Sequence, residues 1–143
     1  YLTSSPGCWR IYTELAARGM PASPWAGLTV DAYAVTHPGA PGPQSTPSAW
    51  IHLITLCFVL ERGWPVGQAI RLRRVGADAF AGWPWLEPPG SMGDVTVVEV
   101  AAATRTDAST ELVRGWVQGA WAAWIDHHPA LLARADELTT RFL

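Results

Sequence analysis

The stretch PSAWIHLITLCFVLER, residues 47–62, decides the fold. Wound as a helix, it is apolar on nearly every side, and its proline suits the first turn of a helix. Other elements have to enclose such a helix, because it has no polar face to leave in water. The sequence therefore predicts a central buried helix over residues 47–62, which ends at Gly63.

Apolar residues at helical spacing predict further helices on both sides of this stretch. Thr96 and Glu99 form a capping box, which favours a helix over the strand that residues 95–100 could also form. Pro129 interrupts the longest pattern and suits the first turn of one more helix. The helices expected around the central one span residues 6–19, 25–37, 64–77, about 97 onwards, 109–127 and 129–143. Gly67 weakens the pattern at 64–77, and the helix from about 97 is short. The predicted fold class is therefore all-α: a single domain over residues 1–143, built as a bundle of five or six helices with two Pro/Gly-rich loops.

The composition is that of a globular protein with few charges: of 143 residues, 49% are hydrophobic and 15% are charged. The net charge of −2 provides no field that would attract nucleic acid or an anionic membrane, so we expect neither as a partner. No apolar run reaches the roughly 18–20 residues that span a bilayer. We expect a cytoplasmic protein, and because the chain opens on Tyr1, we expect a segment upstream to be missing.

Lysine, cysteine and arginine carry no recognisable motif of a reactive site. Lysine is absent, which excludes a Schiff-base or P-loop lysine. Cys8 and Cys57 are too few and too far apart for a metal motif, and we expect both to be reduced. Arg71, Arg73 and Arg74 are interpreted as a solvated helix face.

The four histidines, His37, His52, His127 and His128, form the main candidate site. The short loop between the helices expected at 25–37 and 47–62 makes these helices antiparallel neighbours, which places His37 and His52 near one end of the bundle. If the long helix runs parallel to the first of these helices, His127 and His128 reach the same end. Four imidazoles there would bind a divalent transition metal such as zinc.

Carboxylates near these histidines extend the metal hypothesis. Asp31, Glu61 or Asp126 could supply a further ligand or orient an imidazole. The residues expected around the site, as pocket or supporting residues, are Asp31, Tyr33, Ser48, Thr55, Trp121 and Trp124.

A structural interpretation of the same histidines stays open beside the metal hypothesis. His37, His127 and His128 all end helices, where a cationic ring gains from the helix dipole or caps a backbone carbonyl. His52 could be a buried histidine that is hydrogen-bonded to Asp31, Tyr33 or Thr55. The placement of the four rings decides between the two interpretations.

The nine tryptophans suggest an alternative function. Trp116, Trp121 and Trp124 recur at helical spacing and are more typical of a core than of a ligand cage. Trp83 and Trp85, on a proline-stiffened loop, could cover a pocket or contact a second subunit. The alternative is thus a non-enzymatic interaction domain, or a homo-oligomer, that uses a Trp-rich apolar surface.

Three segments in order, LTVDAYAVTHPG (28–39), WIHLITLCFVLERG (50–63) and WVQGAWAAWIDHH (116–128), resemble an uncharacterised bacterial family, the domain of unknown function 5946 (DUF 5946). Gly7-Cys8-Trp9 and the Gly-x-x-Thr-Val segment at 93–97 also fit this pattern, whereas Thr36 and Gly119 depart from it. The resemblance implies a helical domain of unsettled function. It adds weight to Asp31, Tyr33, Trp121, Trp124 and the four histidines as motif positions, and it assigns no reaction, substrate or cofactor.

Overall fold

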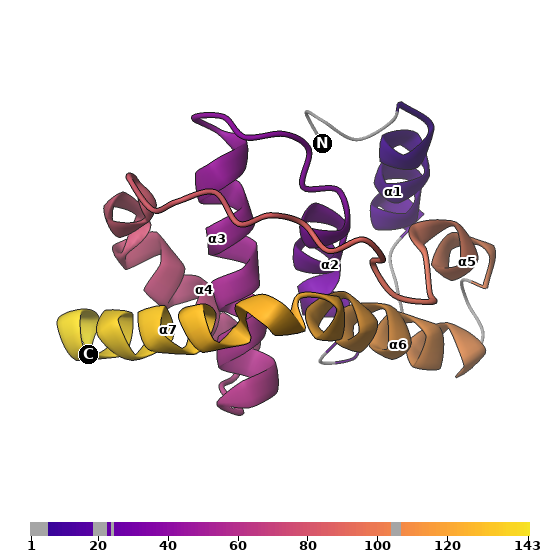
Figure 1. Ribbon diagram of the computed structural model, residues 1–143. Helices are drawn as coiled ribbons and strands as arrows, with labels where there is room; N and C mark the ends of the chain where they lie inside the picture. Colours follow the sequence, from indigo (N-terminus) through magenta and orange to yellow (C-terminus); the bar gives the residue numbers. More distant parts are fainter. Residues whose placement is uncertain (1–5, 19–22, 24, 104–106) are drawn as a thin grey trace.

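The central helix forms as two joined segments. The computed structural model describes residues 6–18, 23, 25–103 and 107–143, and within it helix α3 spans Ser45–Leu56 (Figure 1). A π-helical segment, η2, continues it over Cys57–Glu61. The apolar side chains from Trp50 to Phe58 are almost all buried. The predicted buried central helix is therefore confirmed, whereas its π-helical end was not predicted.

Further helices form as the apolar patterns predicted. They are α1 (Pro6–Arg18), η1 (Ala26–Leu28), α2 (Thr29–Thr36), α4 (Val66–Val75), η3 (Ala77–Phe80), α5 (Val97–Ala102), α6 (Asp107–Ala123), η4 (Ile125–His127) and α7 (His128–Phe142). Helices α2, α4 and α7 pack against α3. Of the seven α-helices in the described part of the chain, six have seven residues or more, and no strand is present there. The all-α fold class is thus confirmed. At residues 95–100 the helix forms, and Thr96 Oγ1 caps it by accepting the Glu99 backbone N–H at 3.4 Å.

Helices α2 and α3 are antiparallel neighbours, as their short connection predicted. A loop of a few residues joins the end of α2 to the start of α3. At the opposite ends, Leu28 just before α2 and Val59 just after α3 line the same pocket. Helix α2 stops at Thr36 because Pro38 disfavours helical geometry at His37, whose φ of −134° and ψ of 57° lie outside the helical region.

Helices α6 and α7 follow each other along one side of the molecule, where α7 crosses α3 and α6 packs against α2 (Figure 1). Trp116, Val117 and Trp121 form a buried stripe on α6, and Trp124, directly after its end, is buried as well. The interpretation of the three tryptophans as core residues is therefore confirmed. Trp124 donates its indole N–H to the carbonyl oxygen of Val35 at 3.1 Å, which ties α6 to the end of α2.

The long segment between η3 and α5 crosses the same side of the molecule and is fixed at several points (Figure 1). The indole of Trp50 donates to the carbonyl oxygen of Pro84 at 2.6 Å, and Trp83 packs edge-on against Trp50. Near its end, Gly93 lies against the backbone of Gly119 in α6. This segment therefore covers the first half of α3.

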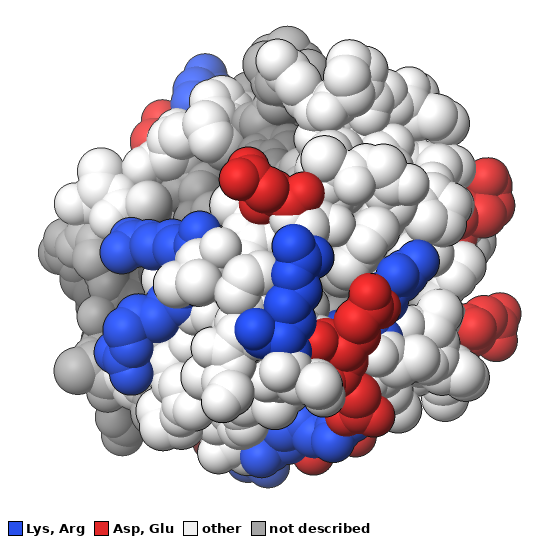
Figure 2. Space-filling model, turned by 90° about the vertical axis from the view of Figure 1, so that its left-hand side faces the viewer, with Lys and Arg blue, Asp and Glu red and all other residues white. Residues whose placement is uncertain are grey.

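Charged side chains are few and mixed. On the face shown in Figure 2, arginines lie beside acidic residues among many neutral ones. No helix in the described part of the chain is long and apolar enough to cross a membrane.

Candidate functional site

A buried carboxylate, Asp31, joins three helices. Its side chain is 0% exposed, and its Oδ1 accepts hydrogen bonds from His52 Nδ1 at 2.7 Å and from Arg73 Nη1 at 2.9 Å. The same Arg73 nitrogen donates to Thr55 Oγ1 at 3.2 Å. Asp31 lies on α2, His52 and Thr55 on α3, and Arg73 on α4. We call these four residues the Asp31 network.

The Asp31 network contains one hydrogen bond that the sequence suggested and one ion pair that it did not. The hydrogen bond between His52 and Asp31 is one of those that the sequence suggested for a buried histidine. Arg73 corrects the interpretation of the α4 arginines: Arg71 and Arg74 are exposed, but Arg73 reaches inward to Asp31. An acidic residue predicted to be buried needs a cation nearby, and this requirement is the signal that could have found Arg73.

One oxygen of the network is not satisfied within the described part of the chain. Asp31 Oδ2 is buried and accepts no hydrogen bond there. Buried polar atoms are nearly always paired, so the unpaired Oδ2 destabilises the folded state. The two bonds to Oδ1 offset this effect, because both donors can carry positive charge.

The three histidines expected at helix ends each bond to a backbone carbonyl. His37 Nδ1 lies 2.8 Å from the carbonyl oxygen of Tyr33, on whose ring it also stacks. His127 Nε2 lies 2.7 Å from that of Glu87, and His128 Nε2 lies 2.9 Å from that of Trp121. The contacts of His37 and His128 are to carbonyls in the last turns of α2 and α6, as the structural interpretation expected, whereas Glu87 lies in the segment between η3 and α5. The long helix expected at 109–127 ends at Ala123, and His128 begins α7 instead of ending that helix.

The four histidines therefore have four separate sets of partners. Among the described residues, which include all four, no group of three or more His, Cys, Asp or Glu side chains is placed to hold a metal ion. Of the expected supporting residues, Thr55 belongs to the Asp31 network, while Tyr33 stacks between His37 and Tyr12. Ser48 lies one turn before His52 on α3.

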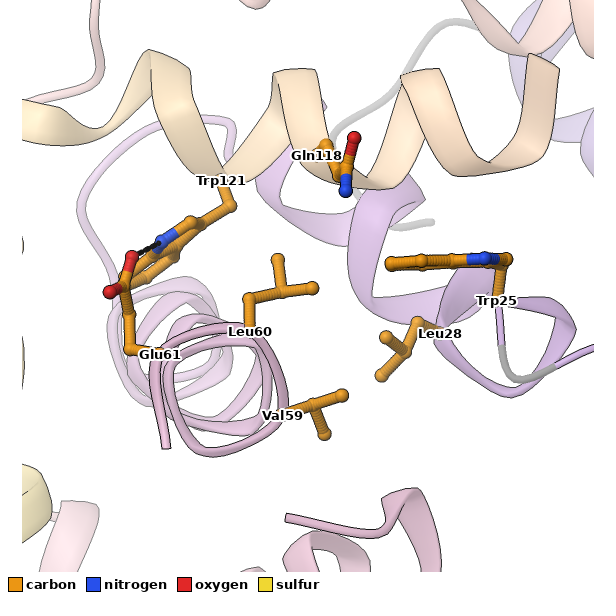
Figure 3. A pocket seen from close by; sticks show the side chains of 7 residues that line it. All are labelled: Trp25, Leu28, Val59, Leu60, Glu61, Gln118 and Trp121. Carbon is orange, nitrogen blue, oxygen red and sulfur yellow. Dashed lines mark hydrogen bonds between the residues drawn. The ribbon is translucent and has the colours of Figure 1, made fainter. Parts of the chain in front are cut away.

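A pocket of about 340 Å³ opens where η1, η2 and α6 meet (Figure 3). Its lining residues are Trp25, Leu28, Val59, Leu60, Glu61, Gln118 and Trp121. Figure 3 shows Trp25 and Leu28 on one side, Leu60, Glu61 and Trp121 on the other, and Gln118 from α6 along a third side. The walls are thus mainly apolar and aromatic, with two polar side chains. Of the residues singled out in the sequence, Glu61 and Trp121 lie here.

Glu61 and Trp121 are held together at one edge of the pocket. The Trp121 indole N–H donates to Glu61 Oε1 at 2.7 Å. The ring of His128 stacks on Trp121 with the centroids 3.8 Å apart, which fixes the orientation of the indole from behind. Two residues of the predicted site, Trp121 and His128, therefore take part in forming this pocket, one as a wall and the other as its support.

Three consecutive side chains at the end of the π-helical segment η2 line the pocket. In a regular helix, three consecutive residues point in directions about 100° apart. The wider turn of a π-helix changes this spacing, and Val59, Leu60 and Glu61 all line the cavity. Cys57 begins η2 and is buried, and burial raises the pKa of its thiol to about 11.

The pocket and the Asp31 network use the same two segments of the chain. Leu28 precedes Asp31 by three residues, and Val59 follows Thr55 by four, so each pair lies about one turn apart. The buried network thus lies next to the pocket wall along the contact between α2 and α3.

These features define a small all-α protein with a buried ionic network beside an aromatic-walled surface pocket. The chain belongs to the family of unknown function DUF5946, whose model matches residues 2–125, and the resemblance seen in the sequence is thereby confirmed. No curated protein and no solved structure matches the chain.

Proposed function

We propose that the protein binds a small organic molecule in the pocket between η1, η2 and α6. The observation that carries the proposal is the mainly apolar and aromatic pocket, three of whose lining residues lie at the end of the π-helical segment η2. π-Helical turns are rare, cost regular hydrogen bonding and are frequent at functional sites. Here such a turn ends the central helix and supplies one wall of the pocket.

The size and lining of the pocket suit such a ligand. Small-molecule sites have volumes of roughly 300–1,000 Å³ and combine apolar walls with a few polar groups. The pocket of about 340 Å³ lies at the lower end of this range, and Glu61 and Gln118 are its polar groups. The expected ligand is therefore compact, with an apolar body.

A pocket-filling variant tests this proposal. The probe is N-phenyl-1-naphthylamine, a neutral dye whose emission rises in apolar surroundings. Val59→Trp places a larger side chain in the cavity, and Val98→Trp places the same side chain on the exposed surface of α5 as a matched control. We expect the wild type and Val98→Trp to bind the dye with a dissociation constant below about 1 mM, and Val59→Trp to bind at least about tenfold more weakly.

Circular dichroism establishes that both variants are folded before binding is compared. Absence of dye binding to the wild type, or equal binding to the wild type and Val59→Trp, would contradict the proposal. The same conclusion would follow if Val98→Trp lost binding to the same extent.

Metal binding by His37, His52, His127 and His128 stays a second prediction. The hydrogen bond between Asp31 and His52 favours it, since carboxylates often orient metal-binding imidazoles in this way. The hypothesis predicts about one equivalent of transition metal in protein purified without a histidine tag, and a lower melting temperature after chelation. Less than about a tenth of an equivalent, with unchanged melting, would contradict it.

The alternative of an interaction or oligomerisation domain also stays a prediction. The large exposed apolar residues, among them Trp9, Val75, Val98 and Ile125, lie on separate helices. Surface apolar residues that are scattered in this way are ordinary in soluble monomers. The alternative predicts a dimer or larger species in sedimentation experiments at micromolar concentration, whereas a monomer would contradict its oligomer form.

A further inference from the structure

We infer that the ligand of the pocket carries a cationic ammonium head on its apolar body, and that Glu61 binds this head. The inference rests on the proposed function and names the class of molecule that the pocket selects. It follows from the charge of Glu61, from the partners of the nearby cations and from the aromatic walls.

Glu61 has no cationic partner in the described part of the chain. Its one recorded partner is the neutral indole N–H of Trp121, which occupies Oε1. The neighbouring Arg62 turns away, with its Nη2 2.6 Å from Asp136 Oδ1 on α7. A carboxylate thus lies at the edge of an apolar pocket with its charge not balanced by an ion pair.

Arg114, another arginine near the pocket in the described part of the chain, also leaves Glu61 unpaired. Arg114 on α6 lies within 3.7 Å of Glu111, and its guanidinium lies 5.9 Å from the ring of Trp25. The ring of Trp25 therefore already accepts a cation at a distance typical of a cation–π contact. Carboxylates and aromatic rings are among the groups with which proteins bind organic ammonium ions.

The same arrangement disfavours other ligand charges. An anionic head beside Glu61 would be repelled by the carboxylate, and a neutral head would gain no ionic attraction to it. The apolar side chains of Leu28, Val59 and Leu60 suit the body of the molecule rather than its head. A primary or quaternary amine with a compact apolar body fits all of these surfaces.

A matched pair of probes tests the inference. 4-Phenylbutylamine is cationic at pH 7, and 4-phenylbutan-1-ol has nearly the same shape without the charge. We expect the amine to bind the wild type at least about tenfold more tightly than the alcohol in calorimetric titrations at low salt. The difference should shrink as salt is added, because Glu61 is exposed to solvent.

Two variants assign the charge effect to one residue. Glu61→Gln removes the charge but keeps a side-chain oxygen that can accept the Trp121 indole N–H, so we expect it to fold and to lose the preference for the amine. Glu14→Gln removes an exposed carboxylate of α1 that does not line the pocket, and it should keep the preference.

The outcomes separate this inference from the proposed function. Equal binding of amine and alcohol to the wild type would overturn the inference and leave the proposed binding function standing. A preference that survives in Glu61→Gln, or that disappears equally in Glu14→Gln, would also overturn the role of Glu61. Absence of binding by both probes would count against the pocket as a ligand site and so against both proposals.

Discussion

Asp31 shows how one buried charge specifies its neighbours. A carboxylate with 0% exposure is stable only when cations and hydrogen-bond donors surround it. His52 and Arg73 meet this need from two other helices, so the choice of one residue on α2 fixes the position of side chains on α3 and α4. The sequence indicated the partner on α3, because few polar residues interrupt that helix, but not the one on α4.

Removing Arg73 should destabilise the fold far more than removing its neighbour. Arg73→Ala leaves the charge of Asp31 buried without its arginine partner, and we expect the free energy of unfolding to fall by about 3 kcal/mol. Arg74→Ala on the exposed face of the same helix should change it by less than about 0.5 kcal/mol. Unfolding by urea measures both, and equal midpoints for the two variants would show that the Asp31 network contributes little.

The thiol of Cys57 should be nearly inert in the folded protein. Burial raises its pKa from 9.0 to about 11, so the reactive thiolate is about a hundredfold rarer than in an unfolded chain at neutral pH. In a Cys8→Ser variant, which leaves Cys57 as the single cysteine, labelling with a disulfide reagent at pH 8 should be at least about a hundredfold slower before denaturation than after it. Similar labelling rates in the folded and the unfolded protein would contradict the buried position of the Cys57 thiol.

At the scale of elements, apolar spacing located most helices to within a few residues, but their ends depended on local geometry. Pro38 ended α2, and Thr96 began α5, for reasons that are visible in the sequence. The π-helical segment η2 has no such signal, because its residues are apolar in either geometry. The pocket was therefore not predicted, although Glu61 and Trp121 were both singled out for other roles.

Two glycines that face each other should respond in opposite ways to alanine. Gly93 has a φ of 98°, and a Cβ there would lie 3.2 Å from the backbone of Gly119, so Gly93→Ala should lower the free energy of unfolding by about 2–4 kcal/mol. A Cβ on Gly119 would meet Gly93 Cα at 4.0 Å, an ordinary contact. Gly119→Ala should therefore be neutral or stabilising by up to about 1 kcal/mol, because alanine favours the helix. Denaturant titrations of both variants measure the free energy of unfolding. Equal losses in Gly93→Ala and Gly119→Ala would contradict this prediction.

At the scale of the whole molecule, indole groups connect segments that are distant in sequence. Trp50 bonds to the segment between η3 and α5, Trp121 to η2 and Trp124 to α2, each through its ring N–H. A buried tryptophan has to place this donor against an acceptor, so each of these bonds fixes two elements relative to each other. The high tryptophan content thus serves the interior as well as the surface.

Alkaline pH should destabilise the folded chain over a defined range. Burial raises the pKa of Cys57 to about 11 and raises that of Tyr12 above 10.0. The folded state therefore holds these protons more tightly than the unfolded state, so their contribution is complete below about pH 9 and is lost as pH rises towards 11. Because the chain has no lysine, few other groups titrate there. As the pH rises from 9 to 11, the denaturant midpoint of unfolding should decrease, and it should decrease less steeply in Cys57→Ala. A midpoint that does not change over this range would contradict the raised pKa values of Cys57 and Tyr12.

The sequence by itself determined the all-α fold class, the buried central helix, and the proline and threonine that bound two helices, and it offered Asp31 as one of three partners for His52. These properties follow from local geometry and from the burial of apolar side chains, both of which depend on spacing along the chain. Only the tertiary structure decided which residues meet across helices: Arg73 with Asp31, Trp121 with Glu61, and each histidine other than His52 with its own carbonyl. Such contacts depend on the relative rotation and crossing of helices, which many side chains set together and no local pattern records.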